Sequence, residues 1–433
     1  MTPLQTGLFG CTLLLLLLAS SMPVGFAMAA AGAIGFAMIV TPAAALSMIA
    51  ADLYETFSSY NLTVIPLFVL MGQIAFHSGI SRRLFNTAYH WMGPLPGGLA
   101  MATIGACAAF GAICGSGPAT AATMAAVALP EMRRYGYSME LAGGAVAAGG
   151  SLGMLIPPSV VFIVYAIMTE QSIGRLFTAG ILPGLMVTAL FCVTIAINCH
   201  RHPGLGPAAP PTTWRQKFAS LRGVTETLLL FGLVMGGLFA GVFTPTEAAA
   251  VGAFGSLLIA MLQRNLSARD LAKALTETVR TSCMVMTIVT GAVIFGRFLA
   301  VTLIPATLAA WLSALPLPPW CIMSLIIFFY LLAGCFVDAL GLIMLTIPIF
   351  YPVVTALGYD PVWFGVIIVV VTQMGVISPP VGVCVYVVSG MERDIPLQTV
   401  FKGALPFLAA LIVAAALLLA FPSISLVLPN LMH

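Results

Sequence analysis

The sequence predicts an all-α polytopic membrane protein, built as an inverted repeat with two re-entrant helical hairpins and two broken helices. Of its 433 residues, 61% are hydrophobic and only 7% are charged, and the mean hydropathy is +1.11. A soluble domain cannot carry this composition, because its surface needs many more polar and charged side chains. The chain must therefore place most of its length in a membrane.

Internal duplication is the second observation behind this prediction. An offset of 222 residues carries Ser116 onto Asp338 and aligns nine identical residues without a gap. In the first half these identities are Pro94-Leu95-Pro96, Pro130, Gly136-Tyr137, Gly153 and Pro157-Pro158. Glycines and prolines at matched places inside apolar runs indicate a duplicated membrane unit.

Charge and cysteine usage exclude several other classes of protein. The net charge of +3 is small and spread over loops, so it bears on membrane orientation and predicts no nucleic-acid partner. The nine cysteines include no Cys-x-x-Cys pair, and most lie in apolar runs, where small packing residues are expected. We expect no metal centre and no cofactor apart from a coupling ion.

Three spans are expected before the first hairpin. No Lys or Arg precedes Arg82, so the first span is predicted to be retained and to start outside the cell. The third span ends at Arg82-Arg83, which the positive-inside rule places in the cytoplasm. The expected spans are 2–21, 26–50 and 62–80, with Asp52 and Glu55 in the polar loop before the third.

The first hairpin is predicted over residues 94–130. Its uncharged run is too long for one straight pass, which takes about 20 residues, and it lies between Arg82-Arg83 and Arg133-Arg134. If both pairs are cytoplasmic, the chain enters and leaves on one face. The tip is then Gly115-Ser116-Gly117-Pro118, where irregular backbone is tolerated only if it lines a cavity or packs on protein.

The first broken helix is predicted over residues 138–169. Pro157 and Pro158 remove two backbone donors, so the helix should unwind there and free carbonyl groups for a ligand. Residues 1–200 form the first repeat, and residues 201–223 form a proline-containing cytoplasmic linker in which Trp214 is an interface anchor.

Residues 224–433 form the second repeat in the opposite orientation. The basic pairs of the first half have no counterparts at the 222 offset, so equivalent loops should lie on opposite faces. This plan gives about ten full passes plus two hairpins, with both termini outside. Its special elements are an interfacial helix over 263–280, a hairpin over 316–352 with its tip near Asp338, and a broken helix over 362–390 that unwinds at Pro379-Pro380.

The breaks also predict the binding chemistry. Helix amino ends at mid-membrane favour a carboxylate, and carbonyl ends favour a cation. A hard cation such as sodium needs several oxygen ligands, for which Ser116 and Asp338 are the first candidates. The remaining candidates for substrate or ion binding are Gly115, Gly117, Thr120, Gly153, Ser159, Ser378 and Arg297.

Each candidate also has a plainer interpretation. Asp338 would then sit in a water-filled crevice without a role, and Ser116 would be a packing residue. Arg297 would either hold a structural acid or extend to the interface instead of binding an anion. Glu247, with Thr246 nearby, suits a helix cap, and Pro157, Pro158, Pro379 and Pro380 would only create the breaks.

Several motifs, in order along nearly the whole chain, resemble the large membrane subunit of tripartite ATP-independent periplasmic (TRAP) transporters. They are Cys114 to Thr120, Leu152 to Ser159, Gly180 to Gly184, Phe243 to Ala253 and Gly375 to Gly382. The resemblance implies an elevator-type, sodium-coupled secondary importer for small carboxylates such as a C4-dicarboxylate or sialic acid. It also implies the bacterial inner membrane, a small four-helix membrane subunit and a periplasmic substrate-binding protein.

The chain departs from the family pattern at three places. The second broken helix reads Thr372-Gln373-Met374-Gly375 and Val383-Cys384-Val385 where asparagines are often found. The third span reads Gly72-Gln73 where a glutamate often follows the glycine.

Other classes fit the sequence less well. The chain has no Gly-x-x-x-x-Gly-Lys loop, so an ATP-driven permease would need separate ATPase partners. A membrane-embedded enzyme would need an acid-base or metal cluster, and no second acid accompanies Asp338. A channel is disfavoured, because duplicated hairpins suit alternating access. A stand-alone proton- or sodium-coupled anion carrier is the closest alternative, since Asp338 could titrate.

Overall fold

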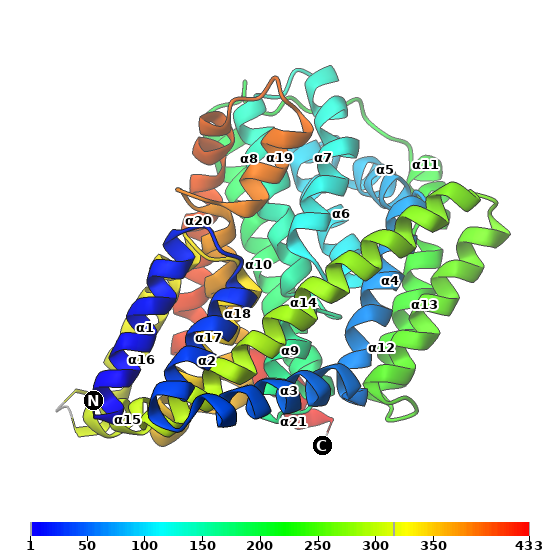
Figure 1. Ribbon diagram of the computed structural model, residues 1–433. Coiled ribbons are helices and arrows are strands. Elements are labelled where there is room, and N and C mark those ends of the chain that lie inside the picture. Colours follow the sequence, from blue (N-terminus) through cyan, green and yellow to red (C-terminus); the bar gives the residue numbers. More distant parts are fainter. Residues whose placement is uncertain (1, 315–316, 433) are drawn as a thin grey trace.

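The computed structural model describes residues 2–314 and 317–432. Residues 1, 315, 316 and 433 lie outside the described residues, and they include the predicted start of the second hairpin and the two outer ends of the predicted repeats. The described part holds α-helices α1 to α21 and three short 3-10 helices, and it contains no strand (Figure 1). The predicted all-α class is confirmed.

Six helices of the described ranges are long and apolar enough to cross a membrane on their own, or seven if the bent pair Trp214–Gly223 and Thr225–Phe239 forms one span. The protein is therefore an integral, multi-pass membrane protein. The count of ten full passes stays a prediction, because it needs the shorter apolar helices as well. The six are Tyr60–His77 (η1 with α4), α10 (Ile173–Arg201), α13 (Pro245–Leu262), α14 (Ala268–Thr302), α17 (Ala339–Ala356) and α20 (Leu397–Ala420).

The sequence duplication extends to the secondary structure. Adding 222 to the bounds of α7 (Gly117–Arg134) gives the bounds of α17 residue for residue. The same shift brings seven further helices of the first half close to helices of the second. These pairs are α1 (Pro3–Ala19) with α12 (Thr225–Phe239), α2 (Val24–Ile39) with α13, α5 (Ile80–Met92) with α15 (Ile304–Ala314), α6 (Gly98–Cys114) with α16 (Pro319–Gly334), α8 (Met139–Ser151) with α18 (Pro361–Ile377), α9 (Val160–Thr169) with α19 (Val383–Met391), and α10 with α20.

One stretch differs between the halves. The first half has α3 (Pro42–Ser58), η1 (Tyr60–Thr63) and α4 (Val64–His77), whereas the second has only α14. Pro66 cannot donate a backbone hydrogen bond, so it suits the first turn of α4 and not a helix interior. Between its start and Gly291, α14 contains neither proline nor glycine.

This stretch corrects two expectations from the sequence. The predicted interfacial helix over 263–280 is not a separate element, because most of it forms about the first third of α14. That helix begins after Ser267, whose hydroxyl accepts a hydrogen bond from the backbone N–H of Asp270. The predicted polar loop with Asp52 and Glu55 is instead helical, as part of α3.

Helix α14 runs diagonally across the molecule in Figure 1, with α12 and α13 on one side of it and α1 and α16 on the other. It packs against α2 with almost no side chain in between. A Cβ atom on Gly291 would lie 2.1 Å from the carbonyl oxygen of Gly25. Such contact between small residues is typical of helix packing in membranes.

Glycines also join the broken helices to the predicted hairpins in both halves. A Cβ atom on Gly111 of α6 would lie 2.8 Å from Cα of Gly153, which belongs to η2 (Leu152–Met154) after α8. A Cβ atom on Gly375 of α18 would lie 2.3 Å from the carbonyl oxygen of Gly334 in α16. Each break is therefore held directly against a hairpin backbone.

The predicted linker over 201–223 is more ordered than a simple connector. It contains α11 (Trp214–Ser220) and η3 (Leu221–Gly223). The linker packs on α5 (Ile80–Met92), where Thr87 Oγ1 donates to the carbonyl of Ser220 at 2.7 Å and Trp91 Nε1 donates to that of Lys217 at 3.2 Å. The chain ends with α21 (Ser423–Leu431), which lies at the same end of the molecule as the start of α1 (Figure 1). Near that end, α15 (Ile304–Ala314) follows α14.

Candidate functional site

Two tips between helices, and parts of two broken helices, meet at one cavity. The first tip is Gly115-Ser116, between α6 and α7. The second is the four-residue segment 335–338, between α16 and α17. These are the places where the sequence predicts the hairpins to turn, although the depth of either tip in a membrane stays a prediction.

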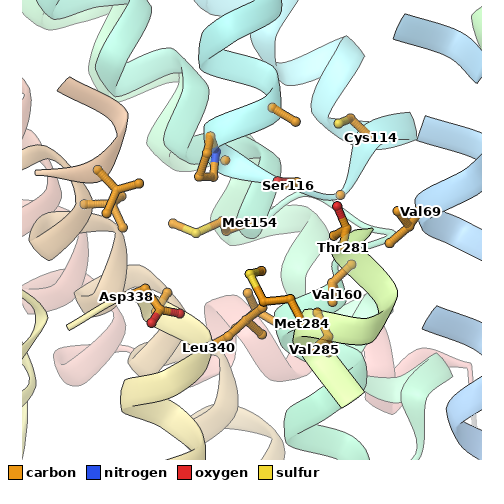
Figure 2. A pocket seen from close by; sticks show the side chains of 18 of the residues that line it. Val69, Cys114, Ser116, Met154, Val160, Thr281, Met284, Val285, Asp338 and Leu340 are labelled. Atoms are coloured by element: carbon orange, nitrogen blue, oxygen red, sulfur yellow. The ribbon is translucent and has the colours of Figure 1, made fainter. Parts of the chain in front are cut away.

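The cavity has a volume of about 410 Å³ and is mostly apolar. Figure 2 shows Ser116 and Asp338 bordering the same space, with the side chains of Met154 and Met284 between them in this view. Four lining residues have polar side chains: Gln73, Ser116, Thr281 and Asp338.

The lining reflects the duplication of the chain. Five pairs of lining residues are separated by 222 positions, so both halves present the same elements to the cavity. The pairs are Ser116 with Asp338, Gly117 with Ala339, Pro118 with Leu340, Met154 with Val376, and Val161 with Val383. The cavity therefore lies where the two halves of the molecule meet.

The first tip leaves a helix amino end without a side-chain cap. Gly115 has φ +63°, and a Cβ atom there would lie 2.6 Å from the carbonyl oxygen of Pro158, so a larger residue would be both strained and crowded. Ser116 occupies the N-cap position of α7 in an extended conformation, but its side chain makes no capping hydrogen bond. The amino end of α7 is thus available to an anion.

At the second tip, a carboxylate side chain caps the amino end of α17. Asp338 is the N-cap residue of α17, and its Oδ2 accepts a hydrogen bond from the backbone N–H of Gly341 at 3.0 Å. Asp338 is half-buried and is the one charged side chain among the lining residues that the structure describes. In its ionised form the Asp338 side chain would favour a cation in the cavity.

The other candidates of the two breaks lie behind the cavity lining. Ser159 Oγ donates to the carbonyl of Met154 at 2.5 Å, and Ser378 Oγ donates to that of Met374 at 2.6 Å. Both serines are buried, and their hydroxyl protons are already committed. Each lies next to a cis Pro-Pro bond, Pro157-Pro158 or Pro379-Pro380.

Thr120 and Gly153 pack against the backbone of the first tip. Thr120 Oγ1 donates to the carbonyl of Ser116 at 2.8 Å, and a Cβ atom on Gly153 would lie 2.6 Å from that Oγ1. Of the residues predicted for the site, the structure brings Gly115, Ser116, Gly117 and Asp338 to the cavity surface. Thr120, Gly153, Ser159 and Ser378 are absent from that surface among the described lining residues.

Arg297 is absent from the described lining of this cavity, so its role in substrate binding stays a prediction. Its Nε lies 2.7 Å from Oδ1 of Asp52, and its Nη2 lies 3.3 Å from Oε2 of Glu55. Asp52 is 1% exposed, so Arg297 neutralises a buried carboxylate and ties α14 to α3. This is the structural-acid role that the sequence left open.

Glu247 has a structural role in the fold. The backbone N–H of Thr244 donates to Oε2 of Glu247 at 2.8 Å, and the N–H of Glu247 donates to Oγ1 of Thr244 at 3.3 Å. The two residues form a capping box at the start of α13. The partner is Thr244 and not Thr246.

The sequence reasoning assigned no site role to three polar residues near the site. Gln73 and Thr281 line the cavity; Gln73 was noted only as a departure from the family pattern, and the signal of Thr281 was a polar side chain beside an apolar run. Gln373 is fully buried, and its Nε2 donates to the carbonyl of Ser151 at 3.1 Å. Ser151 is the repeat equivalent of Gln373, so the 222-residue offset is the signal that could have identified this contact between the halves.

An all-helical, multi-pass protein whose two halves close on one cavity has the architecture of a membrane transporter. Residues 11–424 match the family described as "Tripartite ATP-independent periplasmic transporter, DctM component". The chain belongs to this family and is therefore a large permease subunit of a TRAP transporter.

Two relatives and one solved structure illustrate this similarity. The C4-dicarboxylate TRAP transporter large permease DctM of Pseudomonas aeruginosa is 39% identical over 88% of this chain and 89% of its own length. The sialic acid TRAP transporter large permease SiaM of Vibrio cholerae is 34% identical over 96% of each chain. The Alcanivorax borkumensis YdaH transporter shares the fold, with a TM-score of 0.63 at 15% identity over 87% of this chain and 88% of its own.

Proposed function

We propose that this subunit imports a small carboxylate, coupled to the inward movement of sodium, through an elevator-type alternation of the cavity between the two faces of the membrane. The observation that carries the proposal is the cavity at the junction of the two repeats, with Ser116 and Asp338 at equivalent positions on its wall.

The electrostatics of the lining favour transport of an anion together with a cation. The uncapped amino end of α7 attracts a carboxylate, whereas Asp338 repels it. No Lys or Arg is found among the described lining residues to offset that repulsion. A cation near Asp338 would remove the repulsion, so its binding and that of the anion should assist each other.

Sodium suits this role better than a proton. It is a hard cation that takes oxygen ligands, and the cavity offers the Asp338 carboxylate together with the Ser116 and Thr281 hydroxyls. A proton relay normally uses a series of titratable side chains. Among the described lining residues, Asp338 is the one carboxylic acid and no histidine is present.

The substrate class follows from the chemistry of the cavity and from the relatives. Helix amino ends bind carboxylates, and the two relatives are named for a C4-dicarboxylate and for sialic acid. We propose that the chain acts with a small membrane subunit and a periplasmic substrate-binding protein, in the bacterial inner membrane, with both termini periplasmic. The tripartite description of the family supports these partners.

Uptake of labelled C4-dicarboxylate or sialic acid into liposomes tests the proposal. The liposomes should contain this subunit with its small membrane partner, and the cognate binding protein should be present outside. We expect uptake under an inward sodium gradient and none without the binding protein. Uptake driven by a proton gradient alone would contradict sodium coupling, and uptake without any binding protein would favour a stand-alone anion carrier.

A further inference from the structure

A second cavity, of about 480 Å³, lies between α5 and α7 and shares no lining residue with the transport cavity. Its volume falls within the range of about 300 to 1,000 Å³ that is typical of small-molecule sites. Its polar lining residues are Arg82, Arg83, Asn86, Tyr89, Glu131 and Tyr135. We call it the arginine-tyrosine cavity, and its role does not depend on the transport function proposed above.

Opposite charges face this cavity without neutralising each other. The described residues offer no salt-bridge partner to Arg82 or Glu131, although both line the cavity. Arg83 is already paired, since its Nη2 lies 2.8 Å from Oε2 of Glu226. Unpaired groups of both signs around one space suit a ligand that carries both charges.

Two tyrosines add neutral hydrogen-bonding groups. The hydroxyls of Tyr89 and Tyr135 lie 2.9 Å apart, so one donates to the other and a second proton is left for a ligand or water. Burial, reinforced by the contact with Tyr135, raises the pKa of Tyr89 to about 12. The Tyr89 hydroxyl therefore keeps its proton at physiological pH.

The position of the cavity fits a membrane surface. Helix α5 buries Ile80, Leu84 and Phe85 on one face and exposes Arg82 and Asn86, as in an amphipathic helix lying at an interface. It lies at the opposite end of the molecule from α21 (Figure 1). By the positive-inside rule, the arginines of this end face the cytoplasmic leaflet.

We propose that the arginine-tyrosine cavity binds a phosphoethanolamine group, held as the head group of phosphatidylethanolamine from the cytoplasmic leaflet. Arg82 would hold the phosphate, since a guanidinium group suits phosphate oxygens, and Arg83 would add positive charge beside it. Glu131 would accept hydrogen bonds from the ammonium group. Phosphatidylcholine offers the same phosphate, but its quaternary ammonium has no N–H to donate.

Native mass spectrometry of the delipidated protein with added dioleoyl phosphatidylethanolamine or dioleoyl phosphatidylcholine tests this site. We expect wild-type protein to retain the ethanolamine lipid about tenfold better, the typical effect of one charge-assisted hydrogen bond. Glu131→Gln should abolish that preference, and Arg82→Gln should weaken retention of both lipids. The control is Arg134→Gln, since Arg134 is exposed on the same helix as Glu131 and does not line the cavity, so both retention and preference should stay as in wild type.

A soluble competitor identifies the source of the ligand. If free phosphoethanolamine binds as tightly as the lipid and displaces it, the source is a soluble metabolite and the membrane assignment is wrong. Equal retention of both lipids by wild-type protein would overturn the proposal. So would unchanged retention in Arg82→Gln and Glu131→Gln, and because these variants change different helices, either one that folds is sufficient for the test.

Discussion

The Ser116 tip and the Asp338 tip occupy equivalent positions in the two halves, but they differ in whether a side chain caps the helix that follows. Helices α7 and α17 begin and end at positions 222 residues apart, although the first tip has two residues and the second has four. Ser116 leaves the amino end of α7 without a side-chain cap, whereas Asp338 closes that of α17 with a carboxylate. The proposal that one wall attracts an anion and the other a cation rests on this difference between the two N-cap residues.

The strongest test of this comparison is removal of the charge at the second tip. We expect Asp338→Asn to lower sodium-driven uptake about 100-fold, which corresponds to about 2.7 kcal/mol. The asparagine can still cap α17, so the loss would come from the missing charge. Uptake into liposomes and the sodium concentration that gives half-maximal uptake should both be measured.

Asp360→Asn is the matched control for that variant. Asp360 is also an N-cap aspartate, and its Oδ1 accepts hydrogen bonds from the backbone N–H groups of Val362 and Trp363. It does not line the transport cavity. Equal losses in the two variants would mean that Asp338 acts only as a helix cap.

A charged residue outside both tips should affect stability and not substrate binding. Arg297→Gln leaves the buried carboxylate of Asp52 without its cation, and we expect a loss of about 2 kcal/mol because Arg297 itself is partly exposed. Asp52→Asn combined with Arg297→Gln should recover part of this loss. Thermal unfolding in detergent measures the stability. A large change in substrate affinity would instead indicate that Arg297 takes part in substrate binding.

Making the two tips alike is the next test. In Ser116→Asp the new carboxylate can cap α7, which should stabilise the helix by about 1 kcal/mol. A second negative charge on the cavity should nevertheless lower uptake about tenfold, since it occupies the helix end meant for the substrate. Wild-type uptake by this variant would show that the anion does not bind at α7.

The smallest expected effect comes from removing the Ser116 hydroxyl. Ser116→Ala keeps the backbone amides of α7 and should lower uptake about threefold, through the loss of one neutral oxygen ligand. The half-saturating sodium concentration should rise while that for substrate changes little. If only the substrate value rises, the hydroxyl contacts the anion and not the cation.

Particular residues show which features could be predicted from the sequence and which could not. Gly115 and Pro157-Pro158 interrupt apolar runs, and such breaks are local events that can be located from residue type alone. Arg297 shows the limit, because its partner Asp52 lies 245 positions away and was expected in a loop. The length of α14 was missed for a related reason. The charged side chains of residues 263–280 suggested a separate helix at the membrane surface. In the structure most of these residues continue into the apolar residues that follow, as one helix.

The sequence by itself determined the membrane class, the duplication and the positions of the four breaks, because hydropathy, repetition and helix-breaking residues are properties of the chain alone. Only the tertiary structure decided that Ser116 and Asp338 share one cavity while Ser159 and Ser378 face inward to their own backbone carbonyls. It also decided that Arg297 pairs with a buried acid that lies 245 positions away in the sequence. These outcomes depend on which helix faces meet, and in a membrane that choice is made by close packing between distant segments and not by polarity along the chain.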